Sequence, residues 1–355
     1  MHITFILPGF IKIPVGGVKV VNEYANRLAE RGHAVTLVYP LEIRTGNPIY
    51  FLRKKILSVF DRLQHVSDDL YYIPKPSVNM MVVRRIVSKY IPFGDVVIAV
   101  GWQTAEAVAL LPAEHGNKFY LLQSFETYFS RKKRVLASYR LPLKKIAVSG
   151  WIMAEMEKLG EVSYGPLGNA VHPEEFYIES PPPERNNDVM MIYHPHKIKG
   201  AKDGIDVLRM AKKRFPDLAA VIVAPRKPVH RIPSWVKVFI RPSVSELRYL
   251  YNTSKVFLHT SRWEGWGLPP MEAMACGCAI VATTNQGVQE YLIDKQNAML
   301  CKIDDVDGLT QQVITLLESD QVRAELTING LETVQKYSWT ECTNLLEKYL
   351  REFAI

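Results

Sequence analysis

The chain begins with a strand–helix–strand pattern, and this pattern restricts the fold more than any other feature of the sequence. His2–Leu7 is a short apolar run, typical of a buried strand. Apolar residues then recur at helical spacing over Val18–Arg31, Gly32 ends that helix, and Ala34–Tyr39 is a second apolar strand. Hydrophobic strands joined through a helix predict a parallel sheet with helices on both faces.

The pattern restarts after a polar, proline-rich segment at Ser180–Asp188, whose composition is typical of a linker. Strands are expected at Asp95–Val100, Lys118–Leu122, Lys145–Val148, Val189–Tyr193, Ala219–Val223, Lys255–Leu258 and Ala279–Ala282. Helices are expected at Asp203–Phe215, Ser245–Tyr251, Pro270–Ala275, Gly308–Leu317 and Trp339–Phe353. We therefore predict an α/β protein of two Rossmann-like, doubly wound domains facing across a cleft. Ligands of such sheets bind at the carboxyl ends of the strands.

Length and cysteine content agree with two ordinary intracellular domains. A chain of 355 residues suits two domains of common size. The 4 cysteines lack metal-site spacing, so we expect reduced, structural thiols. Residues 2–7 lack the basic leader and cleavage site of a signal peptide, and no apolar run is long enough to span a membrane. We expect a cytoplasmic protein.

The net charge of +8 is concentrated in the first half of the chain. Residues 1–175 hold 22 Lys and Arg against 15 Asp and Glu, hence +7 of the total. Basic surface attracts acidic lipid, polyphosphate or nucleic acid, but no nucleic-acid motif is present. Phe51–Gln64 is either an ordinary surface helix or a basic amphipathic helix that contacts anionic membrane. Arg131–Arg134 is a solvated charge run, an extension of that basic surface, or a loop over the acceptor.

The segment with the clearest chemistry is 261–277. Glu264 lies in a glycine-rich loop, two prolines open the next helix, and Glu272 falls in its first turn. Two carboxylates held in this way can accept hydrogen bonds from the hydroxyls of a sugar and of a ribose. The helix N-terminus between them favours a phosphate. The alternative is that Glu264 caps a turn and Glu272 complements the helix dipole.

This segment resembles the retaining glycosyltransferases of family 4, which have the GT-B fold. Their pattern is a Glu, seven residues and a second Glu, and the present chain reads EGWGLPPMEAMACGCAIV at 264–281. Further matches are Gly16-Gly17-Val18, Ala147-Val148-Ser149, Gly168-Asn169, Lys199-Gly200 and Ser338-Trp339. The resemblance implies domains of residues 1–178 for the acceptor and 179–338 for the donor, with the helix 339–355 returning to the first.

The resemblance also implies roles for individual residues. Glu264 would contact the transferred sugar, Glu272 the ribose, and Lys199 the diphosphate. Backbone amides near the donor would come from Gly16, Gly17, Trp266, Gly267 and Leu268. No metal ion and no cofactor is expected, because Lys199 and helix dipoles take the place of a cation.

Three positions depart from the pattern or leave alternatives open. His194 stands where the family usually has Arg, so His196 or Lys197 would supply the missing charge, unless the histidines are only an exposed loop pair. Gln123 and Glu126 stand where many relatives have His, as in bacterial enzymes that build surface polysaccharides. Glu126 is a candidate catalytic base or acceptor-binding residue; the alternative is a surface Glu. Asp305-Val-Asp307 is expected to cap a helix rather than to hold a metal.

These observations predict a retaining glycosyltransferase that moves a hexosyl or deoxyhexosyl group from a nucleotide diphosphate-sugar to a hydroxyl of a glycan or lipid-linked acceptor. Assembly of bacterial cell-surface polysaccharide is the expected context, with peripheral contact at the inner face of the membrane and no nucleic-acid partner. An inverting GT-B transferase, a sugar-nucleotide epimerase and a non-catalytic glycan-binding protein are the alternatives. The sequence leaves UDP, GDP and dTDP sugars open as donors.

Overall fold

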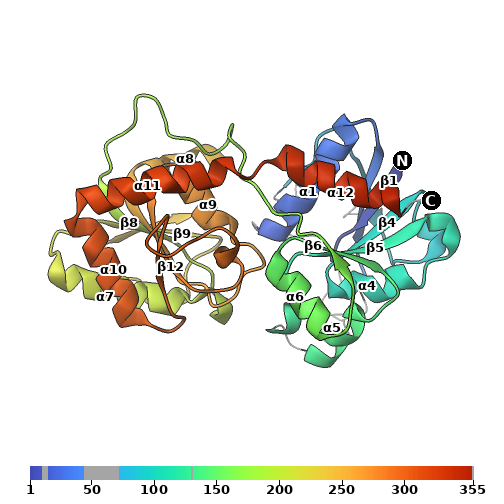
Figure 1. Ribbon diagram of the computed structural model, residues 1–355, viewed down its shortest axis with the longest axis horizontal. Coiled ribbons are helices and arrows are strands. Elements are labelled where there is room, and N and C mark those ends of the chain that lie inside the picture. The colour runs from blue at the N-terminus through green and yellow to red at the C-terminus, as the bar shows by residue number, and fades with distance from the viewer. Residues whose placement is uncertain (10–14, 44–71, 129–130, 354–355) are drawn as a thin grey trace. The chain divides into compact units, whose positions relative to one another are not determined.

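The chain folds into two compact units, each built on one parallel sheet. The computed structural model describes residues 1–9, 15–43, 72–128 and 131–353 (Figure 1). Unit 1 contains Met1–Gly168 and Thr340–Ile355, and unit 2 contains Asn169–Trp339. The amphipathic stretch predicted at Phe51–Gln64 lies outside the described residues.

Unit 1 has a seven-stranded sheet in the order β3-β2-β1-β4-β5-β6-β7. Its strands are β1 (His2–Ile6), β2 (Ala34–Pro40), β3 (Asn79–Val83), β4 (Val96–Val100), β5 (Asn117–Leu122), β6 (Lys144–Ala147) and β7 (Ser163–Tyr164). Its principal helices are α1 (Gly16–Glu30), α4 (Trp102–Ala109), α5 (Lys132–Tyr139), α6 (Gly150–Lys158) and α12 (Trp339–Glu352). The strand order reverses direction between β1 and β4, which makes the sheet doubly wound and defines its switch point.

Unit 2 repeats this plan with six strands in the order β10-β9-β8-β11-β12-β13. The strands are β8 (Asn187–Ile192), β9 (Ala220–Ala224), β10 (Val236–Ile240), β11 (Ser254–His259), β12 (Ala279–Thr283) and β13 (Met299–Cys301). The helices are α7 (Ala201–Arg214), α8 (Val244–Asn252), α9 (Leu268–Ala275), α10 (Val306–Glu318) and α11 (Asp320–Gln335). The switch point of this sheet lies between β8 and β11.

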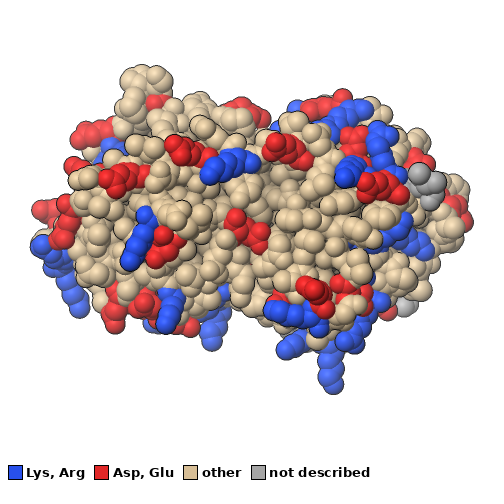
Figure 2. All heavy atoms as spheres, in the orientation of Figure 1, with Lys and Arg blue, Asp and Glu red and all other residues tan. Residues whose placement is uncertain are grey.

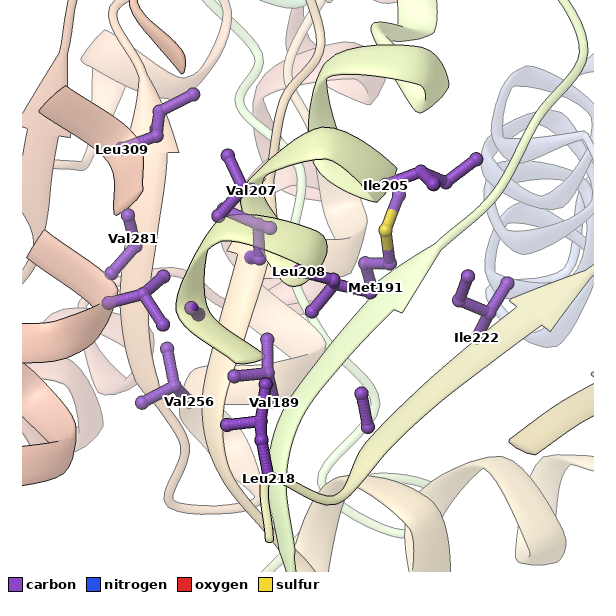
Figure 3. Close-up of a cluster of buried hydrophobic side chains, with 14 of the residues drawn as sticks. Val189, Met191, Ile205, Val207, Leu208, Leu218, Ile222, Val256, Val281 and Leu309 are labelled. Carbon is purple, nitrogen blue, oxygen red and sulfur yellow. The ribbon is translucent and has the colours of Figure 1, made fainter. Parts of the chain in front are cut away.

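Alternation along the central strands of unit 2 produces two separate cores. Val189 and Met191 of β8 pack with α7 and α10 on one face, whereas Met190 packs with α8 and α9 on the other. Figure 3 shows the first core, in which Met191 lies beside Ile205 and Leu208 of α7. A strand buried on both faces carries no polar alternation, which is why the sequence shows continuous apolar runs.

The boundary between the units precedes the predicted one at 178/179. Residues from Asn169 onward belong to unit 2 because they are fastened to it. The guanidinium of Arg185 donates hydrogen bonds to the backbone oxygens of Tyr251, Ser254 and Cys276. The proline-rich segment is therefore anchored to unit 2 and does not act as a free linker.

The last helix, α12, belongs to unit 1, as predicted. Glu347 accepts hydrogen bonds from Arg31 at 2.8 Å and lies 2.9 Å from Nε2 of His33. Burial raises the pKa of this carboxyl, but the hydrogen bonds from Arg31, Arg351 and His33 outweigh it and hold the pKa at about 2. The ionised carboxylate thus fastens the end of the chain beside α1.

Candidate functional site

The centre of the site in unit 2 is an ion pair between Lys199 and Glu264. Lys199 ends a short 3-10 helix, η5 (Lys197–Lys199), that follows β8, and Glu264 lies in the loop that follows β11. The Nζ of Lys199 donates hydrogen bonds of 2.7 Å and 2.8 Å to the two carboxylate oxygens of Glu264. Because β8 and β11 flank the switch point, the loops at their carboxyl ends meet there.

The glycine after Lys199 permits the close approach of the two loops. Gly200 has φ +60°, and a Cβ on it would lie 1.9 Å from the carbonyl oxygen of Thr260. The hydroxyl of Thr260 donates to the Gly200 oxygen at 2.9 Å, and the amide of Arg262 donates to the Ile198 oxygen at 2.7 Å. No larger residue fits at position 200, so the placement of Lys199 next to Glu264 depends on the glycine that follows it.

His259, which the sequence analysis missed, completes the group. Its Nε2 lies 3.7 Å from Glu264 Oε1, and its side chain is 7% exposed. Burial is the main cause that lowers the pKa of His259 to about 4; Lys199 lowers it further and Glu264 opposes both. Burial raises the pKa of Glu264, but attraction to Lys199 and His259 and hydrogen bonds outweigh it, so that carboxyl is ionised.

Glu272 lies in α9, in a different environment from Glu264. The helix begins at Leu268, two residues earlier than predicted, so Glu272 lies beyond its first turn and the dipole-complementing alternative is wrong. The carboxylate is buried and accepts a hydrogen bond of 3.3 Å from Tyr251 Oη. Glu264, by contrast, has its carboxylate in the ion pair with Lys199.

The N-terminus of α9 is held by an aromatic cluster. Trp266 is 4% exposed, stacks on Tyr291 with ring centroids 5.7 Å apart, and donates from Nε1 to Met271 Sδ at 3.0 Å. The hydroxyl of Tyr291 donates to the oxygen of Gly267, which has φ +96°. No side chain in the described part of the chain caps this helix. Pro269 and Pro270 have no N–H, so the amide of Leu268 is the one that the first three residues of the helix offer to an anion.

His194 does not provide the charge of the arginine that it replaces. Its Nδ1 accepts a hydrogen bond of 3.1 Å from the amide of His196. Burial lowers the pKa of His194 to about 4, with further contributions from Lys199, His196 and Arg226, so the ring is neutral near pH 7. Lys197 is exposed beside it. Arg226, just after β9, is a cation close enough to act on His194, and the sequence analysis missed it because no motif surrounds it.

A second group of predicted residues gathers at the switch point of unit 1. The carboxylate of Glu126 accepts hydrogen bonds from the amide of Trp102 at 3.1 Å and from Tyr120 Oη at 3.5 Å. Its own amide donates to Tyr139 Oη at 2.8 Å. Burial raises the pKa of Glu126 to about 7, against the lowering effect of those hydrogen bonds. Glu126 is thus partly covered and held by hydrogen bonds, which favours a role in the site over the surface-Glu alternative.

The paired glycines lie in the same region of unit 1. Gly16 and Gly17 open α1, two residues before the helix start predicted at Val18, and no side chain caps that helix within the described ranges. A Cβ on Gly17 would lie 3.3 Å from Oε1 of Gln123. Gln123 and Glu126 follow β5, and Trp102 follows β4. Helix N-termini and a titratable carboxyl thus meet at the carboxyl ends of neighbouring strands.

The remaining predicted features lie outside these two groups. Asp305 caps α10 by accepting a hydrogen bond of 2.8 Å from the amide of Gly308. Arg134 of α5 pairs with Glu106 at 3.0 Å and lies over the ring of Trp102. On the face shown in Figure 2, basic and acidic side chains are interspersed. None of the helices in the described ranges combines the length and apolar character that a bilayer span needs.

Comparison with known sequences places unit 2 among glycosyltransferases. Residues 174–333 match the family model described as "Glycosyl transferases group 1". The O-antigen chain mannosyltransferase B of Escherichia coli is 30% identical over 109 residues, 31% of this chain and 28% of that protein. The phosphatidyl-myo-inositol mannosyltransferase of Mycolicibacterium smegmatis is 36% identical over 77 residues, 22% of this chain and 20% of its own length. The matched segments thus span a third or less of these relatives.

Solved structures match nearly the whole chain. Sucrose-phosphate synthase from Thermosynechococcus elongatus has a TM-score of 0.75 at 14% identity, covering 99% of this chain and 98% of that one. Anabaena HepE in complex with UDP-glucose gives 0.73 at 16%, covering 99% and 100%. WaaG, a glycosyltransferase involved in lipopolysaccharide biosynthesis, gives 0.69 at 13%, covering 99% of both chains.

These matches confirm the predicted fold: two parallel-sheet α/β domains of the GT-B type. They also identify residues 174–333 as a glycosyltransferase domain of group 1. Lys199, His259, Glu264 and Glu272 all lie inside that range.

Proposed function

We propose that this chain is a retaining glycosyltransferase that moves a sugar from a nucleotide diphosphate-sugar to a hydroxyl of a glycan or lipid-linked acceptor. The observation that carries the proposal is the Lys199–Glu264 ion pair beside the uncapped N-terminus of α9. The ammonium of Lys199 and the amide of Leu268 suit a diphosphate, and a fixed carboxylate suits sugar hydroxyls.

Unit 2 is the proposed donor-binding unit. Lys199 and the amide of Leu268 bind the diphosphate, Glu264 the transferred sugar, and Glu272 the ribose. Arg226 and Lys197 supply the positive charge that neutral His194 does not. As the anomeric C–O bond breaks, negative charge grows on the diphosphate, where Lys199 and the helix dipole stabilise it. The acceptor hydroxyl attacks on the same face of the sugar, so its configuration is retained.

Unit 1 is the proposed acceptor-binding unit. Glu126 is the candidate base, because a pKa of about 7 allows a carboxylate both to accept and to release a proton near neutral pH. The amides of Gly16 and Gly17 lie at an uncapped helix N-terminus and suit oxygen atoms of the substrates. The +7 charge of residues 1–175 supports an acceptor presented at an anionic membrane.

Bacterial surface polysaccharide assembly is the proposed context. The similar proteins include an O-antigen mannosyltransferase and a protein involved in lipopolysaccharide biosynthesis. UDP-glucose occurs in the HepE complex, so UDP-sugars are the first donors to test.

A thermal-shift screen against UDP-, GDP- and dTDP-sugars tests donor binding. A ligand that binds only the native state raises its melting temperature, so at least one donor should stabilise the wild type and fail to stabilise Lys199→Ala. No shift with any donor contradicts the proposal. NMR of the product of the active donor then reports retention, and an inverted product contradicts the retaining mechanism.

A further inference from the structure

The imidazole of His259 is buried beside Glu264, and its Nε2 makes no hydrogen bond within the described part of the chain. That atom lies 3.7 Å from Oε1 of Glu264. Leaving a buried polar atom without a partner is costly, so most such atoms in proteins form a hydrogen bond. Because Nε2 lies near a carboxylate oxygen without bonding to it, a small movement would allow it to donate a hydrogen bond to Glu264 in another state of the site.

Few charged groups face His259 within unit 2. Glu264 approaches from the loop after β11, and Lys199 approaches from η5. Burial lowers the pKa of His194, which follows β8. Lys199 and Arg226, which follows β9, lower that pKa further, and Glu264 raises it. Lys199 holds both oxygens of Glu264, so the buried carboxylate is compensated and His259 has no need of a charge.

A bound diphosphate changes this balance. A nucleotide diphosphate-sugar brings about two negative charges, and the single ammonium of Lys199 must then serve them as well as Glu264. The carboxylate loses part of its compensation in a buried environment, where an unpaired charge is costly. Added negative charge and a less closely held Lys199 both favour the charged form of the imidazole.

We propose that His259 is a positioning residue, which takes up one proton from solvent when a nucleotide diphosphate-sugar binds and, as imidazolium, holds Glu264 against the transferred sugar. The inference rests on the proposed function and adds a proton to its binding step. Only the N–H bond at the imidazole forms, and the buffer supplies the proton. Donor affinity therefore rises as the pH falls through the pKa of His259 in the complex.

Calorimetry of the full chain counts this proton. UDP-glucose and GDP-mannose are suitable probes, because their doubly esterified phosphates have no second ionisation near pH 6. The observed heat includes the ionisation heat of the buffer that supplies the proton, so titrations at about pH 7 in phosphate and in Tris should give different binding heats. The difference should correspond to uptake of about half a proton or more for each donor bound. The dissociation constant should be about tenfold lower at pH 6 than at pH 8.

Two variants locate the proton. His259→Asn should abolish the dependence on buffer and most of the dependence on pH, whereas His194→Asn, the matched nearby histidine, should keep both. Loss of proton uptake in His194→Asn with retention in His259→Asn overturns the assignment. Circular dichroism checks folding; if His259→Asn does not fold, His259→Gln replaces it.

The outcomes separate this inference from the proposed function. Donor binding with equal heats in both buffers overturns the proton-linked role and leaves donor binding intact. Absence of binding by every sugar nucleotide contradicts the proposed function itself. Even if neither variant folds, the buffer comparison on the wild type shows whether donor binding takes up a proton, and equal heats overturn the inference.

Discussion

Lys199 Nζ lies 2.7 Å and 2.8 Å from the two carboxylate oxygens of Glu264, although the residues are 65 positions apart in the sequence. The side chain of Glu264 is 12% exposed, whereas that of Lys199 is 32% exposed. The carboxylate therefore depends on the lysine more than the lysine depends on the carboxylate. A site of this kind is ready for an anion that competes for the ammonium.

A double-mutant cycle measures this dependence. Lys199→Met leaves a buried carboxylate without its cation and should lower the free energy of unfolding by about 2 kcal/mol, between the values for buried and exposed pairs. Glu264→Gln should cost less, because water reaches the ammonium. The double variant should be about 1 kcal/mol more stable than the sum of the two single losses predicts, as measured by urea unfolding. Lys202→Met, which breaks an exposed pair with Asp206, is the control and should leave the midpoint unchanged. Additive effects would contradict the coupling.

Glu272 should determine whether the ribose is recognised. UDP should bind about tenfold more tightly than 2′-deoxy-UDP to the wild type, because one hydrogen bond to a charged carboxylate is worth about 1.5–3 kcal/mol. In Glu272→Gln the two affinities should become similar. Calorimetry measures all four constants, and Glu332→Gln, an exposed carboxylate of α11, is the control. A preference for UDP that survives in Glu272→Gln would reject the ribose contact.

Glu126 should make stability fall at alkaline pH. Its pKa is raised from 4.5 to about 7, so the folded state binds this proton more tightly than the unfolded chain does. That contribution is complete below the unfolded pKa and is lost as the pH rises through about 7. Glu126→Gln cannot ionise and should be more stable than the wild type by about 2 kcal/mol near pH 8.5, with a small difference near pH 5.

Urea unfolding at the two pH values makes that comparison, with the exposed Glu114→Gln as the control. A constant difference between Glu126→Gln and the wild type across pH would show that Glu126 does not titrate in this range. The same variant should also lose turnover at every pH if Glu126 is the base.

Gly200 should tolerate no side chain. Gly200→Ala would place a Cβ 1.9 Å from the Thr260 oxygen at φ +60°, so the Lys199 loop must move. We expect a loss of more than about 3 kcal/mol in unfolding free energy, together with loss of donor binding. Gly160→Ala is the matched control: its φ is +74°, but nothing lies within 4 Å of the added Cβ. It should cost about 1 kcal/mol and leave donor binding unchanged. Equal costs would contradict the steric argument.

The buried central strands of the fold could be predicted from sequence, and the partly exposed edges could not. Continuous apolar runs identify β1, β4 and β11 within one or two residues, because these strands are covered on both faces. The edge strand β10 is largely exposed and Lys237 interrupts its apolar residues, whereas β3 is partly exposed and the sequence analysis missed its apolar run, 80–83. The helix α11 has no apolar stripe; instead Ser319 caps it, and Thr333 hydrogen-bonds to Asn297.

The members of the site could be predicted, but their contacts could not. The segment 264–281 and Lys199-Gly200 are visible as motifs, yet their pairing depends on β8 lying next to β11, which local patterns do not specify. His259 resembles any last residue of a buried strand, and only its distance from Glu264 identifies it. The neutral state of His194 is likewise a consequence of burial and neighbouring cations, which a single sequence cannot show.

Steady-state turnover of Glu264→Gln beside the wild type tests the central claim most directly. With the donor identified by thermal shift and a hydroxyl acceptor, release of nucleoside diphosphate should fall by about 100-fold or more in kcat, while the melting temperature and donor affinity change little. The account predicts this loss in Glu264→Gln and full activity in the exposed control Glu332→Gln. Near-normal turnover by Glu264→Gln, or no turnover of any sugar nucleotide by the wild type, would contradict it.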